Sequence, residues 1–190
     1  MSRILAFAGS TREASVNKKL VRIAAVTARE AGGDVTCIDL RDFPMPIYDG
    51  DFEVAQGLPE NATRLYELMK AHDGLLLACP EYNSSITGVL KNTIDWVSRP
   101  RDAEPPLAAF TGKVAALLSA SPGALGGLRG LVHVRAILGN IGVLVLPQQV
   151  TVSHAFDAFD DDDTLKDARL RERVVRLTAE LVETTRRLNP

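Results

Sequence analysis

Short apolar runs alternate along the chain with longer segments in which apolar residues recur at helical spacing. Continuously apolar runs such as "GLLLAC" and "VAALLS" are typical of parallel strands that are buried on both faces. Apolar residues three and four positions apart are typical of helices that pack on such a sheet. The alternation predicts an α/β fold: a doubly wound, five-stranded parallel sheet with helices on both faces, in three layers.

The pattern places five strands and five helices. The strands are expected at residues 3–8, 34–40, 74–79, 113–119 and 142–146. The helices are expected from Leu20 to a stop at Gly32, from Pro59 to His72, and at residues 89–97, 128–138 and 165–188. The long connections 41–58 and 98–111 are expected as surface loops or functional lids, and the acidic run 160–163 as the solvated start of the last helix.

Length and charge narrow the class of protein. The 190 residues are enough for one sizeable core, so we expect a single domain over residues 1–190. The 22 Lys and Arg are offset by 24 Asp and Glu, which argues against a nucleic-acid partner. The apolar runs are too short to span a membrane, and the two cysteines have no paired spacing, so we expect a cytoplasmic protein.

Three polar loops follow three of the expected strands directly: "GSTREASVN", "PEYNSSITG" and "SASPGALGG". In a doubly wound sheet the ligand binds beyond the carboxyl ends of the strands, where the strand order reverses. The three loops are therefore expected to meet at one edge and to form one ligand site.

The first loop lacks the dinucleotide fingerprint, because hydroxyl residues and an arginine follow Gly9 in place of further glycines. The donors of Ser10, Ser15 and Asn17, together with Arg12, suit a terminal phosphate at the start of a helix. The alternative is that Ser15 and Asn17 only cap this helix.

The other two loops suit a flat ligand. Pro80, Tyr82 and Asn83 predict a rigid turn with an aromatic face and amide donors, although such a loop can also simply pack on its neighbours. The third loop carries small residues and glycines, which leave backbone N–H groups free to face a ring. Together the loops indicate a ligand with a phosphate and a planar heterocycle.

Two of these strings resemble a known family. "GSTREASVNKKL" resembles the phosphate loop G-S-x-R-x-x-S-x-N-x-x-L of the NADPH-dependent FMN reductase family, and "PEYNSSITGVLKNTIDW" resembles its second motif. The third loop is also similar, and the resemblance extends over about residues 3–150. It implies a flavodoxin-like fold that binds FMN.

The resemblance also implies an activity and a site. The activity is hydride transfer from NADPH or NADH through FMN to quinone, azo, metal-oxyanion or flavin acceptors, by a two-step (ping-pong) mechanism, in a homodimer or homotetramer. The segment from Leu90 to Trp96 is expected to contribute to the subunit contact. The residues implied to bind FMN are Ser10, Arg12, Ser15, Val16, Asn17, Pro80, Glu81, Tyr82, Asn83, Ser85, Ser119, Ser121 and Gly123.

This chemistry requires no protein nucleophile, because the cofactors carry it. Candidates for a contact with the 2′-phosphate of NADPH are Arg12, Arg99, Arg101 and Lys91. Two other interpretations stay open: a flavodoxin-like electron carrier without nicotinamide turnover, and a flavin-free sensor of a phosphate ligand. Electron carriers of this kind tend to be strongly acidic, and the formal charge here is only -2.

Overall fold

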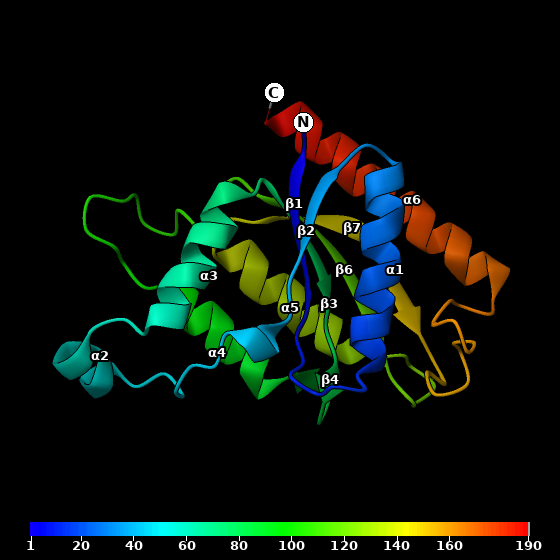
Figure 1. Cartoon of the computed structure of the whole chain (residues 1–190), viewed down its shortest axis with the longest axis horizontal. Coiled ribbons are helices and arrows are strands. Elements are labelled where there is room, and N and C mark those ends of the chain that lie inside the picture. The colour runs from blue at the N-terminus through cyan, green and yellow to red at the C-terminus, as the bar shows by residue number, and fades with distance from the viewer. Residues whose placement is uncertain (190) are drawn as a thin grey trace.

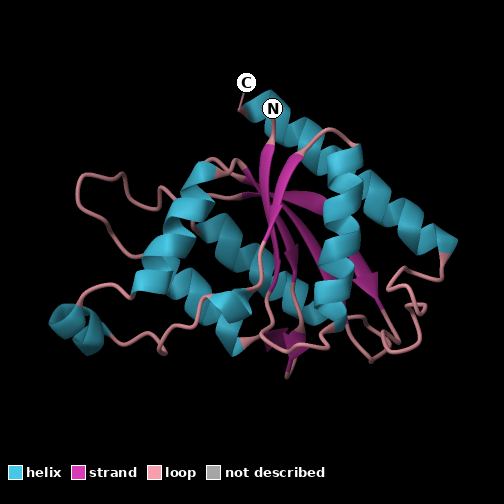
Figure 2. Cartoon of the chain, in the orientation of Figure 1, coloured by secondary structure: helices cyan, strands magenta, loops and turns pink. Residues whose placement is uncertain are grey.

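A parallel sheet of five strands forms the centre of the structure, a computed structural model that describes residues 1–189 (Figures 1 and 2). The strands lie in the order β2-β1-β3-β6-β7 and are all parallel. They are β1 (Arg3–Ala8), β2 (Asp34–Cys37), β3 (Gly74–Ala78), β6 (Val114–Ala120) and β7 (Leu144–Val152). The α/β class that the hydrophobic pattern predicts is confirmed, and so is the flavodoxin-like fold that the resemblance implies.

Helices cover both faces of this sheet (Figure 2). One face carries α1 (Val16–Glu30) and α6 (Ala168–Leu188), and the other carries α3 (Glu60–Ala71), α4 (Gly88–Val97) and α5 (Leu128–Asn140). Alternate residues of β3 show this division, since Leu76 packs in the first core and Leu75 in the second. Within residues 1–189, no helix is both long and apolar enough to cross a membrane.

The last strand is longer than the pattern predicts. Instead of ending at residue 146, β7 continues through Pro147 to Val152, because the chain forms a bulge there. The pairing moves from Ala115–Val145 to Leu117–Gln149, so three residues of β7 lie opposite one residue of β6. A proline is tolerated at such a bulge on an edge strand, where no ladder bond from its nitrogen is needed.

The connection 41–58 is not simply a loop, because it contains a short 3-10 helix, η1 (Leu40–Asp42), and the helix α2 (Gly50–Gln56). Figure 1 shows α2 projecting from the body of the molecule. The segment is fixed by Trp96, whose Nε1 donates to the carbonyl of Pro46 at 2.8 Å. Leu90 and Trp96 are both buried in α4, so only the polar face of this helix remains for the expected subunit contact.

The acidic run does not begin the last helix. Asp160 instead closes a tight turn, in which its carboxylate accepts bonds from the amides of Asp162 and Thr164 at 3.2 and 2.7 Å. The helix α6 begins eight residues later, at Ala168, with Asp167 as its N-cap. The helix-dipole interpretation of residues 160–163 is therefore wrong, because the run lies in a turn that the carboxylate of Asp160 stabilises, before the helix begins.

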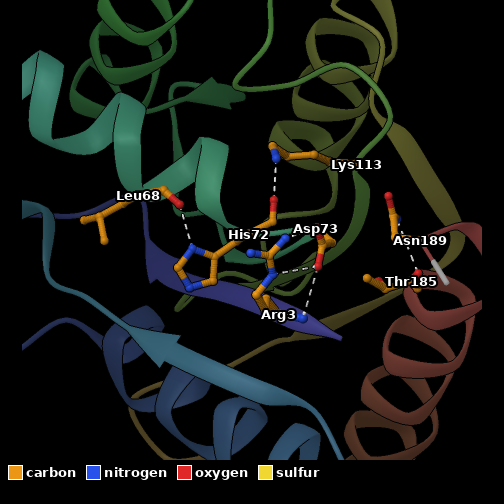
Figure 3. Close-up of polar contacts among 7 residues, drawn as sticks. All are labelled: Arg3, Leu68, His72, Asp73, Lys113, Thr185 and Asn189. Atoms are coloured by element: carbon orange, nitrogen blue, oxygen red, sulfur yellow. Dashed lines mark hydrogen bonds and ion pairs between the residues drawn. The ribbon is translucent and has the colours of Figure 1, made fainter. Parts of the chain in front are cut away.

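A polar cluster closes the amino ends of the strands (Figure 3), at the opposite end of the sheet from the carboxyl ends that the three loops follow. Arg3 donates to the carboxylate of Asp73 at 3.1 and 2.9 Å, and Nδ1 of His72 donates to the carbonyl of Leu68 at 2.6 Å. The buried Lys113 donates to the carbonyl of His72. Burial lowers the pKa of Lys113 to about 8, although the nearby Asp73 opposes this shift.

Candidate functional site

The three predicted loops meet at the carboxyl edge of the sheet, around a cavity of about 70 Å³. Its size admits a compact group and leaves any flat ring to lie across the rim. The cavity is lined by Ser10, Arg12, Ala14, Ser15, Val16, Asn17, Pro80, Glu81, Tyr82, Ala120, Ser121, Pro122 and Phe156. Nine of these residues belong to the predicted site, whereas Asn83, Ser85, Ser119 and Gly123 do not line this cavity.

The first loop leaves the start of α1 uncapped by any side chain. Ser15 occupies the N-cap position with extended backbone (φ −80°, ψ 121°), yet its hydroxyl makes no capping hydrogen bond. The backbone N–H groups of Val16 and Asn17 belong to the first turn, where a helix offers no acceptor. These donors and the positive end of the helix dipole therefore favour an anion at this position.

Asn17 has a different task from the one predicted. Its side chain is buried and bonds the backbone of Ala120 twice: Nδ2 donates to the carbonyl at 2.8 Å, and Oδ1 accepts from the amide at 2.9 Å. The capping alternative for Ser15 and Asn17 is therefore wrong. The hydroxyl of Ser15 is left for a ligand, and the side chain of Asn17 bonds α1 to β6.

Three of the four cations considered for a 2′-phosphate have partners inside the protein. They are Lys91 on Asp95 (2.7 Å), Arg99 on Glu53 (3.0 Å) and Arg101 over the Tyr66 ring (4.5 Å). Arg12 lies in the cavity wall and is exposed, and its side chain makes no hydrogen bond or ion pair within residues 1–189. Of the four cations, Arg12 is the one placed to bind a phosphate.

The second loop is a β-hairpin that the apolar pattern did not predict. Strands β4 (Glu81–Tyr82) and β5 (Ser85–Ile86) are joined by Asn83 and Ser84, which have φ of 50° and 65°. Two consecutive left-handed residues are typical of a type I′ turn. The hairpin holds Tyr82 half-exposed, at 51%, at the rim of the cavity, where its ring offers a flat apolar surface. The hydroxyl of Ser85 is instead 2.8 Å from Nδ1 of His133.

Glu81 fixes the hairpin to α5. Its carboxylate accepts from Arg129 at 2.6 Å and from the amide of Gly130 at 3.0 Å. Burial alone would raise the pKa of this carboxyl, but the two donors outweigh burial and lower the pKa. Glu81 therefore stays ionised and positions the second loop.

The third loop approaches the others closely because of its glycines. Gly126 and Gly127 both have positive φ, and a Cβ on Gly127 would lie 1.9 Å from Oγ of Ser119. Ser119 is fully buried, and its hydroxyl donates to the carbonyl of Cys79 at 2.7 Å. Ser119 thus packs beneath Gly127 and bonds the end of the neighbouring strand, while Ser121 lines the cavity.

A fourth segment that the sequence analysis missed also reaches the cavity. Phe156 lies in the turn after β7 and lines the cavity together with the three loops. The hydrophobic pattern does not place Phe156 at the site, because it ends the last strand at residue 146. With that end, residue 156 would lie far from the carboxyl edge of the sheet, whereas β7 continues to Val152.

The groups present fit the expected cofactor, FMN. A free serine hydroxyl, unpaired helix amides and an unpaired arginine suit the terminal phosphate, which is a compact dianion. The exposed ring of Tyr82 and the small residues of the third loop leave room for a flat ring at the rim. The thiol next to the site, Cys79, is buried, and burial raises its pKa to about 12, so it is no nucleophile.

Comparison with known proteins agrees with this geometry. The chain matches the NADPH-dependent FMN reductase family over residues 2–157. It is 38% identical to an NAD(P)H-dependent FMN reductase of Pseudomonas aeruginosa, covering 90% of this chain and 88% of that one. It is 34% identical to a quinone reductase of Escherichia coli K12, over 76% and 73% of the two chains.

A solved structure supports the same relationship. The flavoenzyme NAD(P)H:(acceptor) oxidoreductase FerB from Paracoccus denitrificans superimposes with a TM-score of 0.82 at 25% identity, covering 98% of both chains. The family match and the identities over most of the chain confirm the resemblance that the loop motifs indicated. The chain therefore belongs to the NADPH-dependent FMN reductase family.

Proposed function

We propose that this oxidoreductase binds FMN at the carboxyl edge of the sheet and reduces quinone, azo, metal-oxyanion or flavin acceptors with NADPH or NADH. The observation that carries the proposal is the start of α1, where a buried N-cap serine leaves its hydroxyl and the first helix amides free for an anion. The names of two relatives, an FMN reductase and a quinone reductase, support the same activity.

The residues of the cavity divide into two binding groups. The hydroxyls of Ser10 and Ser15, the guanidinium of Arg12 and the backbone amides of Val16 and Asn17 hold the phosphate. The ring is flanked by the second and third loops, with residues Pro80, Glu81, Tyr82, Asn83, Ser85, Ser119, Ser121 and Gly123 contributing directly or by supporting those loops.

FMN held by these residues would supply the hydride chemistry: transfer from NAD(P)H to the flavin and then of the electrons to the acceptor, in two steps between which the nicotinamide would leave. The protein's part is to bind and orient. Tyr82 is exposed at the rim of the cavity, so this side of the site is open, and a nicotinamide or an acceptor can reach the flavin ring there. Because Arg12 is assigned to the FMN phosphate and the other three candidate cations have partners within residues 1–189, none of the four is assigned to the 2′-phosphate of NADPH.

The test uses purified protein saturated with FMN. Anaerobic addition of NADPH, and separately of NADH, is expected to bleach the flavin absorbance, and a benzoquinone is expected to restore it. Ser15→Ala is expected to weaken FMN binding by about ten- to a hundredfold, since a hydrogen bond to a charged group contributes about 1.5–3 kcal/mol. FMN that binds but stays oxidised with both nicotinamides would refute the reductase and favour an electron carrier.

We further propose a cytoplasmic homodimer or homotetramer. Val132 on α5 and Leu144 on β7 are large apolar side chains that are 59% and 51% exposed. Two free cysteines, one of them exposed, suit a reducing compartment. Sedimentation velocity of the FMN-loaded protein would measure the oligomeric state, and a monomer at micromolar concentration would refute this part.

A further inference from the structure

Phe156 stands out among the six phenylalanines of the chain. It is 69% exposed, whereas four of the others are buried and Phe52 is 36% exposed. A single exposed apolar residue is ordinary on a protein surface. This one, however, lines the same cavity as the phosphate loop and the third loop.

The exposure of Phe156 does not come from a loose loop. The amide of Ser121 donates to the carbonyl of Val152 at 3.0 Å, and the amide of Ala155 donates back to the carbonyl of Ser121 at 3.1 Å. The amide of Asp157 closes a turn on His154 at 3.0 Å. The backbone before Phe156 is therefore tied to the third loop, and the backbone after it closes a turn on His154, so the chain at Phe156 follows a hydrogen-bonded path.

The buried residues before and after Phe156 indicate on which side of the cavity Phe156 lies. Ala155 and Phe159 are buried in the core between the sheet and the helices α1 and α6. The hairpin that carries Tyr82 is fixed to α5, in the other layer, through Glu81. The two exposed aromatic rings thus belong to opposite walls of one cavity.

We infer that Phe156 is a positioning residue that closes the cavity over bound FMN from the α1 side, and that it sets how slowly FMN is released. The inference rests on the proposed function. Its physical basis is that an aromatic ring held in water gains apolar contact when the cofactor fills the cavity below it. That contact is lost on release, so it acts mainly on the dissociation rate.

The test measures FMN release directly. Wild type, Phe156→Ala and Phe156→Leu are loaded with FMN and diluted, and the return of free-flavin fluorescence gives the dissociation rate. Phe156→Ala is expected to release FMN at least about tenfold faster, and Phe156→Leu less so, because part of the apolar contact remains. Phe52→Ala is the matched control, since Phe52 is an exposed phenylalanine on α2 outside the cavity.

The outcomes separate the two proposals. The thermal stability of the FMN-free Phe156 variants is expected to equal that of wild type, because the ring of Phe156 is mostly in water. If wild type binds no FMN, the proposed function fails and this inference with it. If wild type binds FMN and Phe156→Ala releases it at the wild-type rate, or only as fast as Phe52→Ala, the inference alone fails.

Discussion

Replacing Asn17 tests the division of labour at the start of α1. Strand β3 ends at Ala78, and the amide of Cys79 makes the last bond from that strand to β6, at the carbonyl of Leu118. Two residues further along the same edge of β6, the backbone groups of Ala120 meet the side-chain amide of Asn17 at 2.8 and 2.9 Å. The side chain of Asn17 therefore makes the two hydrogen bonds to Ala120 that a further residue of β3 would otherwise make.

The magnitude follows from these two bonds. In Asn17→Ala the buried amide and carbonyl of Ala120 both lose their partner, and each unsatisfied group costs about 1–3 kcal/mol. We expect the free energy of unfolding to fall by about 2–6 kcal/mol. Ser15→Ala, two residues away, is expected to change it by less than about 0.5 kcal/mol, because the Ser15 side chain makes no bond to the helix.

The assay is urea unfolding of the FMN-free protein, followed by the fluorescence of Trp96, the single tryptophan, which is fully buried. Equal stabilities of the two variants would refute the assignment. So would an Asn17→Ala variant that loses FMN affinity at unchanged stability, because its side chain would then act on the ligand rather than on β6.

Three further variants test other parts of the structure. Burial lowers the pKa of Lys113 to about 8 from an ordinary 10.5, so between these pH values the unfolded chain binds more protons than the folded one. In urea titrations, the free energy of unfolding of wild type relative to Lys113→Met should therefore rise by about 2 kcal/mol from pH 7 to pH 10. A constant or falling difference would contradict this. Gly127→Ala should cost at least about 2 kcal/mol in thermal unfolding, because its φ is +88° and the new Cβ would meet the Ser119 hydroxyl, whereas Gly139→Ala, with open space around it, should be neutral or stabilising. Trp96→Phe should cost about 1–3 kcal/mol and speed proteolysis within α2, since it removes a hydrogen bond that anchors this arm; cleavage at the wild-type rate would contradict the anchoring role.

The hydrophobic pattern located the buried strands well because packing on two faces leaves little choice of residue. Strand β1 begins and ends where the apolar run does, and β3 differs from its prediction by one residue. The pattern failed where local hydrogen bonds or a bulge decide the path. The strand expected at residues 142–146 continues past Pro147 to Val152, and the acidic run lies in a turn closed by Asp160.

The site was predictable as a set of loops but not as a set of contacts. The motif places Ser15 and Asn17 two residues apart and gives them similar polarity, so the sequence cannot tell which one faces the ligand. The end of β3 at Ala78 decides which of the two faces the ligand, because β3 then offers no hydrogen-bond partner to the backbone of Ala120 and Asn17 bonds it instead. The same holds for Ser119 and Ser121, of which one donates into the core and the other lines the cavity.

The groups at this edge also limit what the protein itself contributes to the reaction. Glu81 is held ionised by Arg129 and Gly130, and Cys79 is buried with its pKa raised to about 12. Neither is poised to give a proton near neutral pH. In the proposed reduction of a quinone, we therefore expect the proton that follows the hydride to come from water at the open rim beside Tyr82 and not from Glu81 or Cys79. The pH dependence of turnover should accordingly follow the acceptor's own protonation, and Glu81→Gln should alter cofactor binding through the hairpin while leaving the shape of that profile unchanged.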